Sequence, residues 1–72
     1  MNIKKCYKKL AQNIKLQRVK LNMTQSELAK LASLSRDTVS QLERGVCNPT
    51  LATVIAVADA LNVELNVLLP LK

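Results

Sequence analysis

The sequence predicts an all-α fold, a single domain of five short helices packed around one small core. Apolar residues recur at the helical spacing of three or four positions along most of the chain. Hydroxyl residues suited to capping helix starts precede several of the apolar runs, and the 72 residues include only one glycine and two prolines. This length suits one domain, residues 1–72, and we expect its core over about residues 8–69 and a basic N-terminal arm over residues 1–7.

The first predicted helix covers residues 8–21, and Asn22 follows it as a helix C-terminus. One stripe of this helix is apolar and consists of Tyr7, Leu10, Ile14 and Leu21. A second helix, over residues 25–32, starts at a capping box, in which the Thr24 hydroxyl accepts from the backbone of Glu27 and the Glu27 carboxylate accepts in return. The inward side of this helix is expected to hold Leu28, Leu31 and Ala32.

A third helix is predicted over residues 36–44, after a break of three residues. Ser35 is suited to cap its start, and Gly45 is suited to end it in a left-handed conformation that costs glycine nothing. Val39 and Leu42 mark its inner side.

A fourth helix is expected to start after Thr50 and to end at Asn62. Its inward stripe is predicted to be Leu51, Val54, Ile55, Ala58 and Leu61. The last helix, over residues 65–69, would stop at Pro70.

The charge balance points to a polyanionic partner. Eleven lysines and arginines oppose five acidic residues, a net charge of +6, which favours nucleic acid first and an acidic membrane surface second. The chain has no histidine and no tryptophan, and Tyr7 is its one aromatic residue. Histidine-based catalysis and histidine metal sites are therefore excluded, and single-strand binding by aromatic stacking is disfavoured because it needs several aromatic residues.

We expect no catalytic residues, no metal and no cofactor, because few carboxylates and no glycine-rich phosphate loop are available to build an enzyme site. Cys6 and Cys47 are expected to be reduced thiols, since two thiols alone cannot complete a zinc site. The sequence shows neither a signal peptide nor a membrane-spanning run, so we expect no membrane association and a cytoplasmic protein.

The second and third helices, joined by three residues in a basic all-helical domain, are typical of a helix-turn-helix. The outer side of the third helix is polar and varied. On a helical wheel it presents Asp37, Gln41 and Arg44, flanked by Arg36, Thr38 and Ser40. These side chains both donate and accept hydrogen bonds, as readout of the DNA major groove requires.

Two charges are predicted to lie on apolar stripes. Arg18 lies between Ile14 and Leu21 on the first helix, and Glu43 lies beside Leu42 on the third. A charge on a buried stripe needs a partner. We therefore predict a partly buried, bidentate ion pair between Arg18 and Glu43.

Four motifs follow one another along the chain. They are Thr24-Gln25-Ser26-Glu27-Leu28-Ala29, Ser35 with Val39-Ser40-Gln41-Leu42-Glu43-Arg44-Gly45, Asn48-Pro49-Thr50, and Ala58-Asp59-Ala60-Leu61-Asn62-Val63. With these motifs the sequence resembles the Cro/lambda-repressor-type helix-turn-helix family, also called XRE-type, over about residues 10–69. The resemblance implies a five-helix lambda-repressor-like domain of bacterial or phage origin, usually dimeric, that binds operator DNA and regulates transcription.

The resemblance also implies a role for individual positions. Those that would read bases are Arg36, Asp37, Thr38 and Gln41. Those that would contact phosphates are Thr24, Gln25, Ser35, Arg44, Asn48 and Thr50, helped by the free N–H groups at the start of the second helix. Arg18 and Glu43 match an ion pair of the family, in agreement with the wheel.

Some positions depart from the family pattern. Ser33 stands where the turn usually has glycine, so a left-handed backbone there would be strained. Val46 and Cys47 replace residues that are often basic. Asp37 is acidic, and it would either accept from a cytosine amino group or hold Arg36 or Arg44 in place.

These features predict a sequence-specific regulator that binds double-stranded DNA, a repressor that binds a palindromic operator as a homodimer. An apolar surplus in the last third of the chain favours dimerisation there. It comprises Ala52, Ala56, Val57, Val63, Leu65, Val67, Leu68, Leu69 and Leu71. The alternative is an antitoxin that binds its toxin through this segment and represses its own operon.

The start of the chain is basic, with Lys4, Lys5, Lys8 and Lys9 close together. We expect a solvated, flexible arm there. An alternative is that the arm adds phosphate contacts or enters a flanking minor groove.

Overall fold

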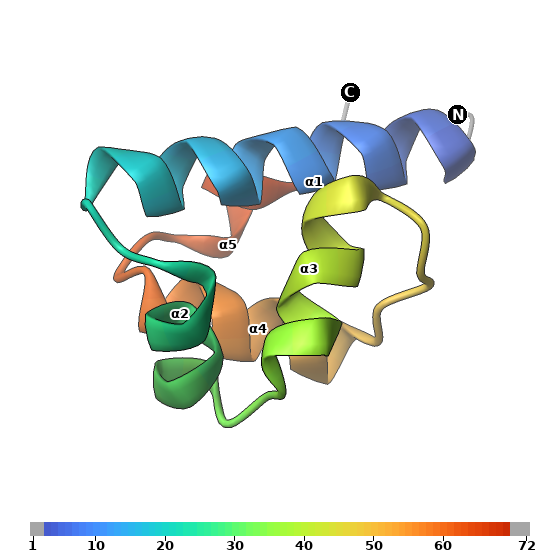
Figure 1. The fold of residues 1–72 in the computed structure, drawn as a ribbon. Helices are drawn as coiled ribbons and strands as arrows, with labels where there is room; N and C mark the ends of the chain where they lie inside the picture. The colour runs from blue at the N-terminus through green and yellow to red at the C-terminus, as the bar shows by residue number, and fades with distance from the viewer. Residues whose placement is uncertain (1–2, 70–72) are drawn as a thin grey trace.

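The computed structural model describes residues 3–69, and in this range it is all-helical, as the sequence predicts. Its helices are α1 (Ile3–Lys20), α2 (Gln25–Ala32), α3 (Arg36–Arg44), α4 (Leu51–Ala60) and α5 (Leu65–Leu68). Figure 1 shows α1 running along one edge of the molecule, with the end of α3 against its N-terminal half. The helix α2 packs on both α3 and α4, and the short α5 packs on α1 and α4.

Three helices start where capping residues predict. Thr24, Ser35 and Thr50 have extended backbones, and each side chain accepts a hydrogen bond from the backbone N–H three residues later. Such a cap satisfies one of the N–H groups that a helix start leaves without a partner, and its removal costs about 1 kcal/mol.

Each of the first four helices is followed within two residues by a left-handed residue. Asn22 (φ 54°), Ser33 (58°), Gly45 (69°) and Asn62 (56°) lie at or just after the helix ends. Asparagine and glycine adopt this conformation at low cost, whereas serine does not. The strain predicted for Ser33 is therefore present in the turn between α2 and α3.

One cluster of buried side chains forms the core and joins all the helices. It contains Leu10, Ile14, Leu28, Ala29, Ala32, Val39, Leu42, Val54, Val57, Ala58, Leu61 and Leu68. At the end of the chain Leu68 is fully buried, and Val63, Leu65 and Leu69 pack against the cluster. Part of the apolar surplus of this segment thus closes the core, while Pro70 and Leu71 lie outside the described residues.

Four predictions of inward-facing residues are wrong. Leu21, Leu31, Leu51 and Ile55 are between 49% and 62% exposed. Leu21 follows the end of α1 and so leaves its helical stripe, and α2 turns its small Ala29 inward in place of Leu31. In α4 almost every residue is apolar, so periodicity cannot select a face. The buried face includes Val57, which the predicted inward stripe left out and which was counted in the apolar surplus instead.

The basic segment at the start of the chain is not a flexible arm from Ile3 onward. It forms the first turns of α1, which begins at Ile3 instead of residue 8. The periodicity of Tyr7, Leu10 and Ile14 identified only the part of this helix that reaches the core. Tertiary contact with the end of α3 accompanies its first turns.

Candidate nucleic-acid interface

The helices α2 and α3 form a compact helix-turn-helix unit. They pack against each other, and the turn between them is held by hydrogen bonds from the N–H groups of Ser33 and Leu34 to the carbonyls of Lys30 and Ala29. The inner side of α3 is anchored by Val39, which is fully buried, and by Leu42, which is 4% exposed. This burial holds α3 as a fixed element of the domain.

The outer side of α3 is uncovered in the described part of the chain. Arg36, Asp37 and Arg44 are exposed, and Thr38 and Gln41 are half-buried. The four positions predicted to read bases therefore lie in the first two turns of one accessible helix. The proposed reading role itself stays a prediction.

Asp37 and Gln41 are hydrogen-bonded to each other. Gln41 Nε2 donates to Asp37 Oδ2 over 3.1 Å, one helical turn away. Of the two alternatives for Asp37, holding Arg36 or Arg44 is not what the structure shows, because its partner is Gln41, and accepting from a cytosine amino group stays a prediction. One amide N–H and the carbonyl oxygen of Gln41 remain, which are the two groups that glutamine uses to pair with adenine.

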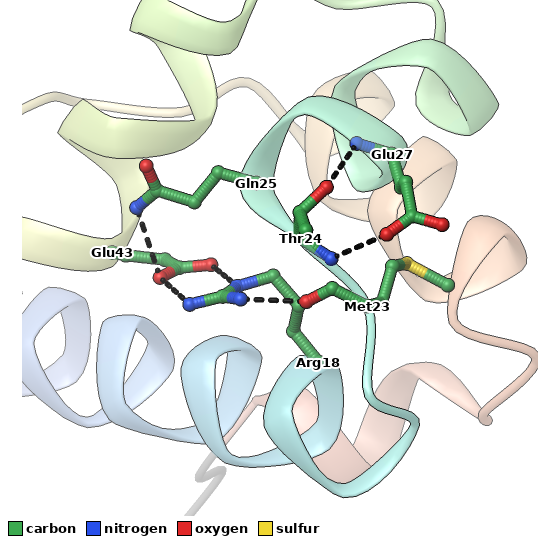
Figure 2. Close-up of polar contacts among 6 residues, drawn as sticks. All are labelled: Arg18, Met23, Thr24, Gln25, Glu27 and Glu43. Atoms are coloured by element: carbon green, nitrogen blue, oxygen red, sulfur yellow. Dashed lines mark hydrogen bonds and ion pairs between the residues drawn. The ribbon is translucent and has the colours of Figure 1, made fainter.

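The predicted ion pair between Arg18 and Glu43 is present and bidentate (Figure 2). Arg18 Nε donates to Glu43 Oε2 over 2.6 Å, and Nη2 donates to Oε1 over 3.0 Å. The third nitrogen of the guanidinium, Nη1, donates to the Met23 carbonyl over 2.6 Å. The two side chains are 13% and 3% exposed, so this link between α1, α3 and the start of α2 is largely shielded from water.

Gln25 joins this network, which the sequence did not reveal. Its Nε2 donates to Glu43 Oε1 over 3.2 Å (Figure 2). The two residues are 18 positions apart on different helices, so only the packing of α2 against α3 brings them together. Gln25 is thereby oriented at the start of α2, with one amide N–H left to donate.

The start of α2 is closed by the predicted capping box. Glu27 N donates to the Thr24 hydroxyl over 3.0 Å, and Thr24 N donates to the Glu27 carboxylate over 2.9 Å (Figure 2). Hydrogen bonds to the Glu27 carboxylate, first from the Thr24 backbone N–H and second from the Thr24 side chain, lower the pKa of Glu27 below its ordinary range. The N–H groups of Gln25 and Ser26 have no acceptor within the helix and are free to bind an anion.

The starts of α3 and α4 share one arrangement. The Ser35 hydroxyl accepts from Thr38 N and lies 2.8 Å from the Thr38 hydroxyl. The Thr50 hydroxyl accepts from Thr53 N and lies 3.0 Å from the Thr53 hydroxyl. Two neighbouring hydroxyls use one of their protons between them, so each pair keeps one O–H to donate outward. Thr53 was missed at the sequence level, although its spacing from Thr50 repeats that of Thr38 from Ser35.

Other kinds of site receive no support in the described range. Among residues 3–69, no three side chains of the metal-binding types lie close enough together to hold an ion. Within the same residues, no helix combines the length and the apolar character that crossing a bilayer requires.

Comparison with known proteins gives a consistent assignment. The Helix-turn-helix family matches residues 14–68. A transcriptional regulator of the HTH type from Archaeoglobus fulgidus is 42% identical over 53 residues, which are 74% of this chain and 75% of the relative. The immunity repressor protein of Bacillus phage phi105 is 40% identical over 57 residues, 79% of this chain but only 40% of the length of that repressor.

A solved structure agrees with these relatives. The restriction-modification controller protein C.AhdI from Aeromonas hydrophila superimposes with a TM-score of 0.84 at 32% identity, over 86% of this chain and 94% of the controller. Both sequence and fold therefore match, over the segment that contains α2, the turn and α3. The chain belongs to the Cro/lambda-repressor-type (XRE-type) helix-turn-helix family of DNA-binding transcription regulators.

Proposed function

We propose that this chain is a sequence-specific regulator that represses transcription by binding a near-palindromic operator in double-stranded DNA as a homodimer. The observation that carries the proposal is the two-sided character of α3. Its inner side is buried on the core, while its outer side presents an uncovered row of donors and acceptors. The phage repressor and the restriction-modification controller among its relatives support a target operon of the phage, mobile-element or restriction-modification type.

In this proposal, base edges are read by the first turns of α3. The reading side chains are Arg36, Asp37, Thr38 and Gln41. Phosphates on either side of the groove are contacted by residues at three helix starts, at the end of α3 and in the loop after it, namely Thr24, Gln25, Ser35, Arg44, Asn48 and Thr50. The network of Arg18, Glu43 and Gln25 sets the distance between α2 and α3, and therefore between phosphate contact and base contact.

The homodimer is supported by apolar residues that the fold leaves uncovered on α4 and α5. Leu51 and Ile55 are 62% and 49% exposed on α4, and Val67 is 42% exposed on α5. These two helices pack against each other. A two-fold contact through this C-terminal surface would place two copies of α3 one turn of DNA apart, about 34 Å. Sedimentation that finds only monomer at tens of micromolar without DNA would count against this dimer.

Two matched substitutions test the proposal. Gln41→Ala should change the preference at one base pair, by about 1–3 kcal/mol, and leave the salt dependence of binding intact. Arg44→Ala should weaken binding to all duplexes and make the negative slope of log K against log salt shallower by about 0.9 per bound protomer, with the preference unchanged. If Gln41→Ala leaves both affinity and preference as they were, α3 does not read bases through this residue.

A second candidate function is that of an antitoxin. It is favoured by Leu16 and Val19 of α1, which are 57% and 53% exposed and line a shallow apolar surface with Gln12 and Lys15. A toxin could bind there or on the C-terminal surface. Mixing the chain with the product of the adjacent gene and measuring the mass in solution separates the two functions, because only the antitoxin forms a stable complex of two different chains.

A further inference from the structure

The N-terminal turns of α1 lie beside the end of the recognition helix. A Cβ added to Gly45, just after α3, would stand 3.5 Å from the Lys8 Cα, 3.6 Å from the Ala11 Cβ and 3.7 Å from the Tyr7 carbonyl oxygen. Figure 1 shows the end of α3 against the N-terminal half of α1. The start of α1 thus borders Arg44 and the loop that leads to Thr50, where the proposed function places phosphate contacts.

The charge on α1 is entirely positive. The helix carries six lysines and Arg18 but no acidic residue, and Arg18 is already paired with Glu43. Positions 4, 8 and 11 follow one another at helical spacing, and Ala11 is buried at the contact with Gly45. Lys4 and Lys8 therefore lie on the flank of α1 next to α3, whereas Lys9 lies about 160° around the helix from Ala11.

This arrangement works against the stability of an isolated helix. Lys4 and Lys8 are one turn apart with the same charge, and so are Lys5 and Lys9. Positive charges at a helix start also oppose the helix dipole, and the first turn of α1 has no acidic residue to offset them. An anion bound along this flank would relieve both effects.

We propose that Lys4 and Lys8 extend the DNA interface beyond Arg44, to backbone phosphates that flank the base pairs read by α3. The inference rests on the proposed function. This flank of α1 adjoins the end of α3, where the proposed function places a phosphate contact. Contact is with the backbone and independent of sequence. From Ile3 onward this segment is a helix about 10–12 Å wide, so its backbone does not enter a minor groove about 6 Å wide as an extended arm would.

The test compares Lys8→Gln with Lys9→Gln on two duplexes. One duplex ends at the limits of the operator, as defined by selection of binding sites from random duplexes. The other duplex continues for about ten base pairs on each side of the operator. Both variants lose one charge from adjacent positions of the same helix, so general electrostatic attraction falls equally. On the long duplex, Lys8→Gln should make the negative slope of log K against log salt shallower by about 0.9 per bound protomer. The double variant Lys4→Gln/Lys8→Gln should change this slope by about twice that amount.

As the control, Lys9→Gln should change the slope of log K against log salt less than Lys8→Gln does on the long duplex. No variant should change the base preference. On the short duplex, Lys8→Gln and Lys9→Gln should behave alike. Equal slopes for the two variants on the long duplex would overturn the inference while leaving the proposed function intact. A wild-type chain that prefers no duplex sequence would overturn the proposed function itself. Helix content and melting, measured by circular dichroism, should be kept or improved in each variant, since repulsion between lysines is reduced.

Discussion

Replacing Arg18 by methionine is the sharpest test of how the two DNA-contacting helices are held. The substitution keeps an unbranched side chain of similar length but removes three hydrogen bonds, two to Glu43 and one to the Met23 carbonyl. Glu43 would keep the bond from Gln25 alone. With its side chain 3% exposed, its charge would have little access to water.

The magnitude follows from this burial. Breaking a buried pair by removing one partner costs about 3–5 kcal/mol, because an uncompensated charge is left behind. At about 0.05–0.15 kcal/mol per residue, a domain of 72 residues is stabilised by about 4–11 kcal/mol in total, so Arg18→Met should remove a large fraction. Each kcal/mol corresponds to about 4–8 °C in melting temperature at this size. Glu43→Leu should cost less, since the Arg18 side chain is 13% exposed and can reach water more easily.

Urea unfolding followed by circular dichroism measures these differences, with Arg18→Met/Glu43→Leu as the control. The double substitution replaces both charges by apolar groups, which is often neutral, so it should recover most of the loss. A cost below about 1 kcal/mol for Arg18→Met would show that the pair behaves like one exposed to solvent. A double variant as unstable as Arg18→Met would show that the unpaired carboxylate is not the cause.

Three other substitutions probe helix ends and starts. Ser33→Gly should raise the free energy of unfolding by about 0.5–1 kcal/mol, because glycine relieves the left-handed backbone but gains entropy when unfolded; a loss in urea unfolding would contradict this. Gly45→Ala should cost about 1–2 kcal/mol by thermal melting, from its φ of 69° alone, since the nearest atoms stand at ordinary contact distance. The lowered pKa of Glu27 stabilises the fold fully above the ordinary glutamate pKa of about 4.3, and this contribution is lost as the pH falls through the lowered pKa. The stability difference between wild type and Glu27→Ala should therefore shrink on acidification, and a difference that stays constant down to pH 2 would refute the assignment.

Local chemistry made the helix limits predictable. A hydroxyl three residues before a first-turn N–H is a cap wherever it occurs, and Thr24, Ser35 and Thr50 all act in this way. The buried face of α4 could not be predicted, because apolar residues surround that helix and only its neighbours select Val54 and Val57. The start of α1 at Ile3 was not predicted either, because the apolar stripe identified in the sequence begins only at Tyr7.

The contacts of the candidate site were also predictable in part. Opposite charges on two apolar stripes identified Arg18 and Glu43 before their geometry was known. The bond between Gln41 and Asp37 could have been found from their spacing of four residues on one helix. The bond from Gln25 to Glu43 could not, since it exists only after α2 and α3 pack together.

Selection of binding sites from random duplexes tests most directly whether the outer row of α3 reads DNA. The account predicts one enriched motif with two-fold-related halves, whose centres are about 10–10.5 base pairs apart. Repeating the selection with Gln41→Ala should relax one position in each half. If no motif is enriched even at low salt, where phosphate contacts are strongest, α3 is not a recognition helix and the proposed function is wrong.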